Sequence, residues 1–407
     1  MKAIRNLSSQ ARQYLLITAN YCAFTLTDGA LRMLVLLYFH QLGYSPLAIA
    51  LLFLFYEIFG VLTNLVGGWL GARFGLNKTM NIGLALQILA LAMLMVPSHL
   101  LSVTYVMAAQ ALSGIAKDLN KMSAKSAIKL LVPEQNNHQL YQWVARLTGS
   151  KNTLKGLGYF LGGLLLACLG FTGAISLMAA LLTLVWLISL IKLPTELGKA
   201  TAKAKFSQLF SNSAAINLLS AARLFLFAAR DVWFVVALPV YLARELTWSH
   251  TAISAFIAVW IIFYGVMQVL APKMTFKASN RAPTSKDASL WGAVLVIVPV
   301  SMISALQFEL SSQWTLLLGL LVFALIFAIN SALHSYLIVA MARRDGVSLD
   351  VGFYYMANAC GRLLGTVLSG WVFQAYGLSA CLVISAIFIA LAALFAALIK
   401  RFSLTSA

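Results

Sequence analysis

Long apolar runs separated by short polar loops recur along the whole chain. A helix needs about 20 mostly apolar residues to cross the hydrocarbon core of a bilayer, so 407 residues leave room for roughly a dozen spans. Helices and closed barrels are the structures that satisfy every backbone polar group in lipid. The pattern therefore predicts an all-α membrane protein with 12 transmembrane helices. These are expected at residues 14–39, 47–71, 79–97, 102–124, 142–168, 172–193, 217–243, 250–271, 288–308, 314–341, 351–375 and 379–399.

The composition excludes an ordinary soluble domain. Hydrophobic residues make up 61% of the chain and charged residues 10%, whereas soluble domains carry about 25% charged residues. Lys2, Arg5 and Arg12 precede the first apolar run, and no small-residue cleavage site follows a short apolar segment. We therefore expect the first span to be retained rather than removed as a signal peptide.

The net charge of +18 is distributed unevenly between the loops. Of the short loops on the opposite side, only one holds a basic residue, Arg244. The positive-inside rule then predicts that both termini are cytoplasmic. The excess charge is explained by topology, so nucleic acid is not an expected partner. The basic side carries the N-terminus, Arg73, Lys78, Lys125, Lys129, residues 192–205, residues 273–286, Arg343, Arg344, Lys400 and Arg401.

The sequence lacks the common signatures of cofactor chemistry. Cys22, Cys168, Cys360 and Cys381 all lie in apolar runs without CxxC spacing, so neither a disulfide framework nor a thiolate metal site is indicated. No phosphate-binding loop of the ATPase type is present either. We expect no metal, no cofactor and no enzymatic activity.

Two six-helix halves are indicated by an internal repeat. At a spacing of 207 residues, Lys155 aligns with Arg362, and three glycines align with three others: Gly158 with Gly365, Gly163 with Gly370 and Gly170 with Gly377. The polar, lysine-dotted stretch 194–213 lies between the sixth and seventh spans. We therefore predict an N-terminal bundle at 1–193, a cytoplasmic linker at 194–213 and a C-terminal bundle at 214–407.

A second alignment supports this repeat. Ile58 to Leu70 resembles Ile262 to Met274 when one residue is inserted. Just upstream, Tyr44, Ser45, Ala48 and Ile49 match Trp248, Ser249, Ala252 and Ile253. Parallel repeats about an axis along the membrane normal are typical of major facilitator transporters, whose substrate lies at the interface of the halves near the midplane.

Two short motifs resemble the major facilitator superfamily. GGWLGARFGLNK, Gly67 to Lys78, is similar to its loop after the second span; Arg73, Gly75 and Lys78 fit, but Ala72 stands where the family usually has aspartate. Gly158, Gly162 and Gly163 resemble the fifth-span motif of exporters, with Tyr159 in place of its proline. The resemblance implies the fold of that superfamily, and the glycine motif hints at antiport.

Three longer segments resemble one subfamily, the organoarsenical efflux permeases called ArsJ. They run from Thr18 to Pro46, from Gln110 to Glu134 and from Leu147 to Gly163, and each places unusual charges in an apolar span. The resemblance implies export of 1-arseno-3-phosphoglycerate, which glyceraldehyde-3-phosphate dehydrogenase makes from arsenate, and hence arsenate resistance. A functional link to that dehydrogenase, a bacterial inner membrane location, a monomeric state and coupling to the proton gradient are the matching expectations.

Charged residues inside predicted spans are the candidate site, because such residues are expensive in a membrane and usually face a cavity or a bundle interior. Lys155 and Arg362, one from each half, form the leading pair, since separated cations suit a substrate with two anionic ends. The fuller set of substrate-binding candidates is Lys155, Arg362, Arg230, Lys117, Arg32, Asn152, Tyr21 and Asn358. A second set, for proton coupling or structural charge, is Asp28, Asp231, Glu57 and His334.

Each candidate also has a structural interpretation. Asp28 and Arg32 are four residues apart and could neutralise each other, while Arg230 and Asp231 should point about 100° apart, so each would need another partner, such as Asp28 for Arg230. The sequence equally allows an intrahelical pair of Asp118 with Lys121, a tie from Glu57 to a neighbouring helix and a purely structural His334 near Asn330. Helix-to-helix hydrogen bonds are the alternative role for Asn20, Tyr21, Thr25, Asn152 and Asn358. Counted from the ends of their spans, Lys117, Lys151 and Arg223 are expected on the cytoplasmic side. Lys125 and Lys129 are expected to snorkel to the headgroups.

Two rival functions are compatible with the sequence. Exchange of a sugar phosphate or another organic anion for inorganic phosphate would need the same positive cavity. A membrane sensor or scaffold without transport would need a signalling appendage, and the loops are too short to hold one.

Overall fold

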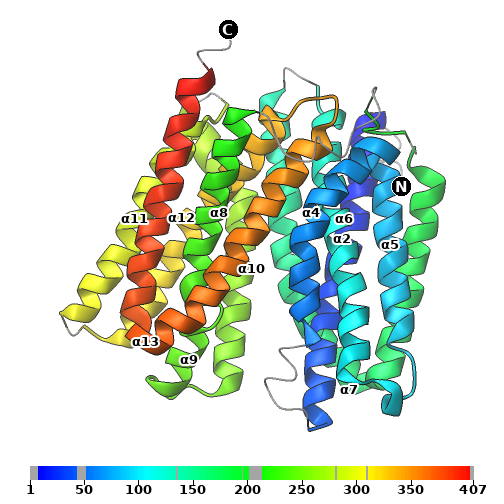
Figure 1. The fold of residues 1–407 in the computed structure, drawn as a ribbon, viewed down its shortest axis with the longest axis horizontal. Helices are drawn as coiled ribbons and strands as arrows, with labels where there is room; N and C mark the ends of the chain where they lie inside the picture. The colour runs from blue at the N-terminus through cyan, green and yellow to red at the C-terminus, as the bar shows by residue number, and fades with distance from the viewer. Residues whose placement is uncertain are drawn as a thin grey trace. The chain divides into compact units, whose positions relative to one another are not determined.

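The computed structural model describes residues 8–43, 52–133, 136–194, 196–200, 213–279, 282–308 and 310–403 (Figure 1). The chain divides into two compact units. Unit 1 comprises Met1–Asn136, Ser150–Phe210 and Ala342–Met356, and unit 2 comprises Asn137–Gly149, Ser211–Met341 and Ala357–Ala407. Each unit thus includes a short helical segment from the other predicted half, and the predicted bundles 1–193 and 214–407 stay a prediction.

Unit 1 is built around α6 (Val103–Leu131), which packs against α2 (Ser9–Gln41), α4 (Leu54–Phe74) and α5 (Leu76–Met93). A short 3₁₀ turn, η1 (Ser98–Leu100), precedes α6. Most of α7 (Asn137–Lys192) completes the unit, together with the first turns of α13 (Val347–Ser403). Its core is apolar and includes Phe24, Leu34, Phe39, Leu84, Leu91, Val106, Phe171 and Ile175.

Unit 2 is built around α12 (Ser312–Met341), which packs against α8 (Ala214–Phe234), α10 (His250–Ser279) and α11 (Ser285–Gln307). The short α9 (Ala237–Arg244) continues the line of α8. An aromatic cluster fills the core: the Trp233 ring meets Trp260 and Phe323 edge-on at 6.0 and 5.0 Å. Such edge-to-face pairs add to the stabilisation that burial alone gives.

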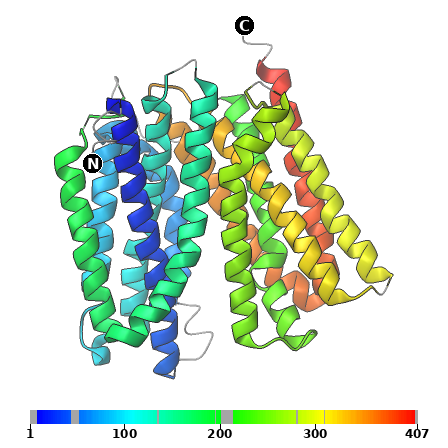
Figure 2. The same ribbon diagram turned by 180° about the vertical axis from the view of Figure 1, so that it is seen from behind.

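Glycines bend α7 and α13 at equivalent positions. Gly170 has φ 66° and ψ −179°, and Gly377 has φ 75° and ψ −174°. This region is one that glycine enters without steric cost, so each long helix can break into two arms there. The bend in α7 is visible where its teal and green arms meet (Figure 2). The predicted equivalence of these glycines at a spacing of 207 therefore has a direct backbone counterpart.

The helices account for the predicted membrane spans. Eight of the described helical stretches are long and apolar enough to cross a membrane, and both α7 and α13 provide two arms. With α4 and α6, whose charged residues belong to the candidate site, the described residues form twelve membrane-length segments. They are α2, α4, α5, α6, two arms of α7, α8 with α9, α10, α11, α12 and two arms of α13.

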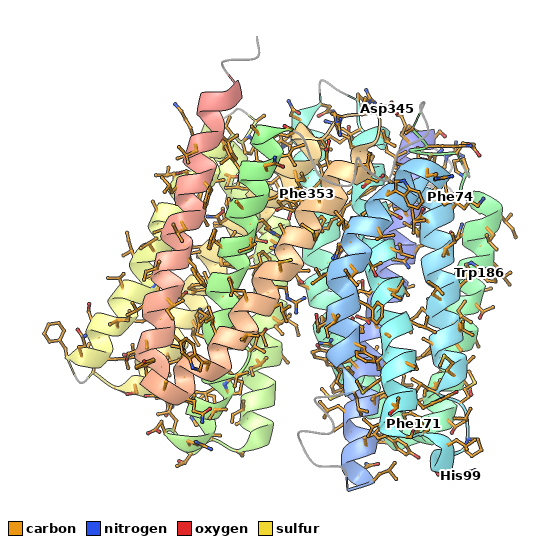
Figure 3. All side chains as sticks on the ribbon, viewed as in Figure 1. Phe74, His99, Phe171, Trp186, Asp345 and Phe353 are labelled. Atoms are coloured by element: carbon orange, nitrogen blue, oxygen red, sulfur yellow. The ribbon has the colours of Figure 1, made fainter. Side chains whose placement is uncertain are left out.

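Successive loops of unit 1 lie at opposite ends of its helices. Phe74 and Asp345 lie at one end, and His99 and Phe171 at the other (Figure 3). This alternation is what the predicted topology requires. Residues 195 and 201–212 of the predicted linker lie outside the described residues, as do Lys2, Arg5, Glu134 and the stretch from Tyr44 to Ile49.

Candidate functional site

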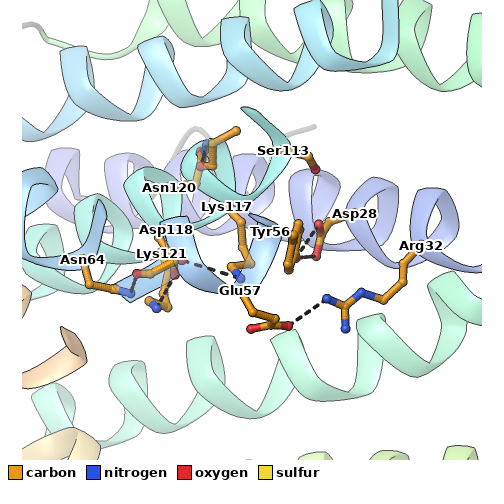
Figure 4. Close-up of polar contacts among 12 residues, drawn as sticks. Asp28, Arg32, Tyr56, Glu57, Asn64, Ser113, Lys117, Asp118, Asn120 and Lys121 are labelled. Atoms are coloured by element: carbon orange, nitrogen blue, oxygen red, sulfur yellow. Dashed lines mark hydrogen bonds and ion pairs between the residues drawn. The ribbon is translucent and has the colours of Figure 1, made fainter. Parts of the chain in front are cut away.

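Lysines of α6 form a stripe along one face of the helix. Lys117, Lys121 and Lys125 recur every four residues, a spacing that places side chains one above another. The carboxylate of Asp118 accepts a hydrogen bond from Lys121 and lies 3.6 Å from the ammonium of Lys117 (Figure 4). The predicted intrahelical pair of Asp118 and Lys121 is confirmed, but one buried carboxylate serves two ammonium groups.

Two tyrosines provide further contacts for Lys117 and Lys125. The Nζ atom of Lys117 lies 3.8 Å from the ring centroid of Tyr56, a cation–π geometry. Lys125 donates a hydrogen bond to the hydroxyl of Tyr355 and lies 4.6 Å from its ring centroid. Only 2% of Lys125 is exposed, so the prediction that it snorkels was wrong. A tyrosine from the first turns of α13 gives its ammonium a partner inside unit 1 instead.

Close packing of α7 on α2 positions a second pair of lysines, Lys151 and Lys155. A Cβ atom on Gly29 would lie 2.9 Å from the carbonyl oxygen of Lys155, and one on Gly158 would lie 2.7 Å from that of Leu26. Small residues thus let α7 approach α2 closely, as they do in other membrane helix bundles. The Nζ atom of Lys155 lies 5.7 Å from the ring centroid of Tyr159.

Asp28 and Arg32 take partners from α4 rather than from each other. The Tyr56 hydroxyl donates to Asp28, at 2.7 Å from Oδ1 and 2.8 Å from Oδ2. Arg32 donates to Oε1 of Glu57 at 2.9 Å, and its guanidinium lies 4.5 Å from the Tyr56 ring centroid (Figure 4). The tie from Glu57 to a neighbouring helix is thus observed. Because the Glu57 side chain is 39% exposed, the pair contributes about 1 kcal/mol or less.

Unit 1 therefore holds more buried or half-buried cations than acids. The group around Tyr56, Asp118 and Tyr355 contains the cations Arg32, Lys117, Lys121, Lys125, Lys151 and Lys155 and the acids Asp28, Glu57 and Asp118. Unit 1 also holds the half-buried Lys129 and the buried Asp350, which pairs with Arg343. At an effective dielectric constant of about 20, two like charges roughly 8 Å apart repel by about 2 kcal/mol. An anion that enters this cluster relieves that repulsion, which makes the cluster a candidate anion site.

Unit 2 contains its own charged group, a carboxylate shared by two arginines. Asp231 is fully buried, lies 2.5 Å from Arg230 and accepts a hydrogen bond from Nε of Arg362 at 3.3 Å. The expectation that Arg230 and Asp231 need other partners was wrong for Arg230, because its long side chain folds back onto its neighbour. The group carries a net charge of +1, since two guanidinium groups face one carboxylate.

A buried polar network surrounds Arg223, which the sequence placed on the cytoplasmic side. Arg223 donates to Oδ1 of Asn358 at 2.9 Å and to both the carbonyl and hydroxyl oxygens of Ser331 at 3.1 Å. Tyr264 and Gln268 also bond the Ser331 hydroxyl, at 3.1 and 3.0 Å. Sequence reasoning missed this network because its members are spread over α8, α10, α12 and α13.

The other polar candidates are mostly buried. His334 is 1% exposed and its Nδ1 atom has no hydrogen-bond partner among the described residues. Asn330 donates to the carbonyl oxygen of Ala288 at 3.2 Å. Tyr21 is 2% exposed, whereas Asn152 is half-buried on α7. Within the described parts of the chain, no group of three or more His, Cys, Asp or Glu residues is placed to hold a metal ion.

The sequence profile of the Major Facilitator Superfamily matches residues 15–284 and 219–403, which together span nearly the whole chain. The chain belongs to the major facilitator superfamily. It is therefore a multi-pass membrane transporter of that superfamily, which moves a small-molecule substrate by alternating access, and not an enzyme. No curated protein sequence matches this chain.

Solved structures share this superfamily fold. A bacterial homologue of the iron transporter ferroportin, in an outward-facing state, aligns with a TM-score of 0.74 and 14% identity over 96% of this chain and 100% of its own. The human organic anion transporter MFSD10 aligns with a TM-score of 0.74 and 15% identity over the same shares. The proton:xylose symporter XylE aligns with a TM-score of 0.72 and 14% identity over 95% of both chains. These likenesses show the fold alone.

In the superfamily loop from Gly67 to Lys78, apolar packing takes the place of the usual aspartate at Ala72. Gly75, with φ 97°, separates α4 from α5, and Ala72 packs against Leu349. A Cβ atom on Gly68 would lie 2.5 Å from the carbonyl oxygen of Ser348, whose hydroxyl donates to Gly68 at 2.7 Å. Backbone contact at a glycine thus fixes α4 against the start of α13 inside unit 1.

Proposed function

We propose that this transporter exports an organic anion with phosphate-like ends, 1-arseno-3-phosphoglycerate, and so confers arsenate resistance. The observation that carries the proposal is the excess of cations in unit 1, where seven buried or half-buried basic side chains outnumber four acids. An intramembrane surplus of this kind is costly unless the site receives negative charge. The resemblance of three charged segments to organoarsenical efflux permeases selects the substrate from among the organic anions.

In this proposal the cations Lys155, Arg362, Arg230, Lys117 and Arg32 attract the substrate, with Asn152, Tyr21 and Asn358 as polar contacts. Asp28, Asp231, Glu57 and His334 hold structural charge or carry the coupled proton. Asp28 is the strongest of these for proton coupling, since it is 7% exposed and bonded by a neutral tyrosine hydroxyl rather than by a cation.

The protein lies in the bacterial inner membrane as a monomer, with both termini in the cytoplasm and with the bundles 1–193 and 214–407 joined by the linker 194–213. The proton gradient drives export, and glyceraldehyde-3-phosphate dehydrogenase supplies the substrate from arsenate.

A second candidate is exchange of a sugar phosphate, or another organic anion, for inorganic phosphate. The cation excess supports it equally, because a phosphate ester needs the same positive site. The fold shared with an organic anion transporter is in keeping with either candidate.

Uptake into inverted membrane vesicles separates the two candidates. The substrate is formed outside the vesicles by glyceraldehyde-3-phosphate dehydrogenase from labelled glyceraldehyde 3-phosphate and arsenate, with NAD+ as the hydride acceptor. We expect proton-driven accumulation that sugar phosphates inhibit weakly and that vesicles with Lys155→Gln lose. Vesicles with Lys192→Gln, an exposed lysine at the end of α7, serve as the control. Phosphate-dependent exchange of a sugar phosphate, without uptake of the arsenic compound, would establish the second candidate instead.

A further inference from the structure

Lys151 differs from the other cations of unit 1 in its contacts. It lies one turn before Lys155 on α7 and is half-buried. Arg32 has Glu57, Lys117 and Lys121 have Asp118, and Lys125 has the Tyr355 hydroxyl. Among the described residues, Lys151 has no carboxylate within salt-bridge distance and no side-chain hydrogen bond.

The charges that act most strongly on Lys151 are positive. Four lysines act on it electrostatically, namely Lys117, Lys121, Lys125 and Lys155. Asp118 also interacts electrostatically with Lys151, but its carboxylate already accepts a hydrogen bond from Lys121 and lies close to Lys117. A lysine in these surroundings lacks the partner that a structural ammonium group would have.

A buried hydroxyl on α2 also lacks a partner. Its residue, Tyr21, lies next in sequence to Cys22, whose thiol donates to the hydroxyl of Ser150, the residue before Lys151, at 3.9 Å. Tyr21 is 2% exposed, and its hydroxyl makes no hydrogen bond with any described residue. Tyr355 and Asp118, which contact Lys125 and Lys121, both act electrostatically on Tyr21. A buried hydroxyl without a partner is a costly feature that a bound ligand can satisfy.

We propose that Lys151 binds the tetrahedral oxyanion group of the substrate, a phosphoryl or arsenyl group. The Lys151 ammonium group provides up to three N–H donors, and Tyr21 donates from its hydroxyl. Lys121 and Lys125 supply further positive charge, so the site suits a dianion better than a single carboxylate. This assignment rests on the proposed function and narrows it, because it names the residue and the chemical group that carry recognition.

Binding of three probes to the purified full-length protein in lipid nanodiscs tests the assignment. The probes are 3-phosphoglycerate, inorganic phosphate and glycerate, which lacks the phosphate. We expect the native protein to bind 3-phosphoglycerate at least about tenfold more tightly than glycerate, since a dianion gains more from the cluster. Lys151→Gln should lose about tenfold or more in affinity for 3-phosphoglycerate and change little toward glycerate. Inorganic phosphate shows whether the oxyanion alone suffices.

Matched variants distinguish ligand binding from a structural role. Lys129→Gln removes the same charge from α6 outside the group of lysines that act on Lys151, and it should bind like the native protein. Lys151→Arg should retain most of the affinity. Without ligand, Lys151→Gln should melt at or above the native temperature, because it relieves repulsion among like charges.

These measurements distinguish failure of the proposed function from failure of the role of Lys151. If the native protein binds none of the anions, the proposed function fails and the role of Lys151 fails with it. If the native protein binds 3-phosphoglycerate and Lys151→Gln binds it as tightly as Lys129→Gln does, the role of Lys151 is overturned while the function stands. A Lys151→Gln protein that does not fold, or melts lower without ligand, would also overturn it by showing that the lysine is structural.

Discussion

The carboxylate of Asp231 contacts both Arg230 and Arg362 in unit 2, so its removal has a predictable cost. Asp231 is fully buried, and the side chains of Arg230 and Arg362 are 14% and 36% exposed. Asp231→Asn keeps the shape but leaves two guanidinium groups facing an amide. Breaking a buried ion pair by removing one partner costs about 3–5 kcal/mol.

We place the expected loss at the lower end of that range, about 3 kcal/mol, because solvent screens the more exposed Arg362. For a unit of this size, 1 kcal/mol shifts Tm by roughly 2–4 °C, so Tm should fall by roughly 6–12 °C. Thermal unfolding in detergent, followed by tryptophan fluorescence, is suitable because Trp233 and Trp260 lie buried in the core of unit 2.

Two further variants make the result interpretable. Arg362→Gln leaves Asp231 paired with Arg230 and should lower Tm by only about 3 °C, which corresponds to about 1 kcal/mol. The double variant Asp231→Asn with Arg230→Gln removes the more buried of the two arginines and should recover more than half of the loss. If Asp231→Asn melts within about 2 °C of the native protein, or if the double variant recovers nothing, the charge-compensation argument is wrong.

Glycine and tyrosine variants test the packing of the two units. Gly365→Ala should cost about 1–3 kcal/mol, because its Cβ would lie 2.7 Å from the carbonyl oxygen of Ala228. Gly370→Ala is the control: no atom lies within 4 Å of its new Cβ, so it should be neutral or slightly stabilising in the same thermal assay. Gly377→Ala should lower stability by about 1–2 kcal/mol through its positive φ; an unchanged Tm would show that the bend relaxes. Tyr56→Phe should cost about 1–3 kcal/mol by leaving the buried Asp28 carboxylate without its donor, and equal stability of the variant and native proteins would contradict this.

The spacing of 207 residues shows how far sequence alone can reach. It aligned Gly170 with Gly377, and both are the bend points of a long helix with nearly the same dihedral angles. It also aligned Gly158 with Gly365, and a Cβ atom at either position would lie 2.7 Å from a carbonyl oxygen of the neighbouring helix. The role of a glycine can be predicted from a repeat because it depends on backbone conformation, and the two copies of a repeat share their backbone conformation.

Contacts of long side chains could not be predicted in the same way. Helical geometry gives the direction of each Cβ atom, and from that direction Arg230 and Asp231 were expected to diverge. A guanidinium group on a flexible stem can fold back, and here it reaches its neighbour at 2.5 Å. Likewise, the buried Lys125 depends on a hydroxyl from Tyr355, 230 residues further along the chain, and no local pattern records such a pair.

The two repeats differ at the residue that packs beside the aligned cation. Gly158 packs against Leu26 and Gly29, and Gly365 packs in the same manner against Ala228 and Asp231. Gly29 thus occupies in unit 1 the place that Asp231 occupies in unit 2. Arg362 has this acid as a partner, but Lys155, its counterpart in the repeat, has glycine there. The repeat therefore keeps the cation at this position in both units, but it places an acid beside the cation in unit 2 and a glycine in unit 1.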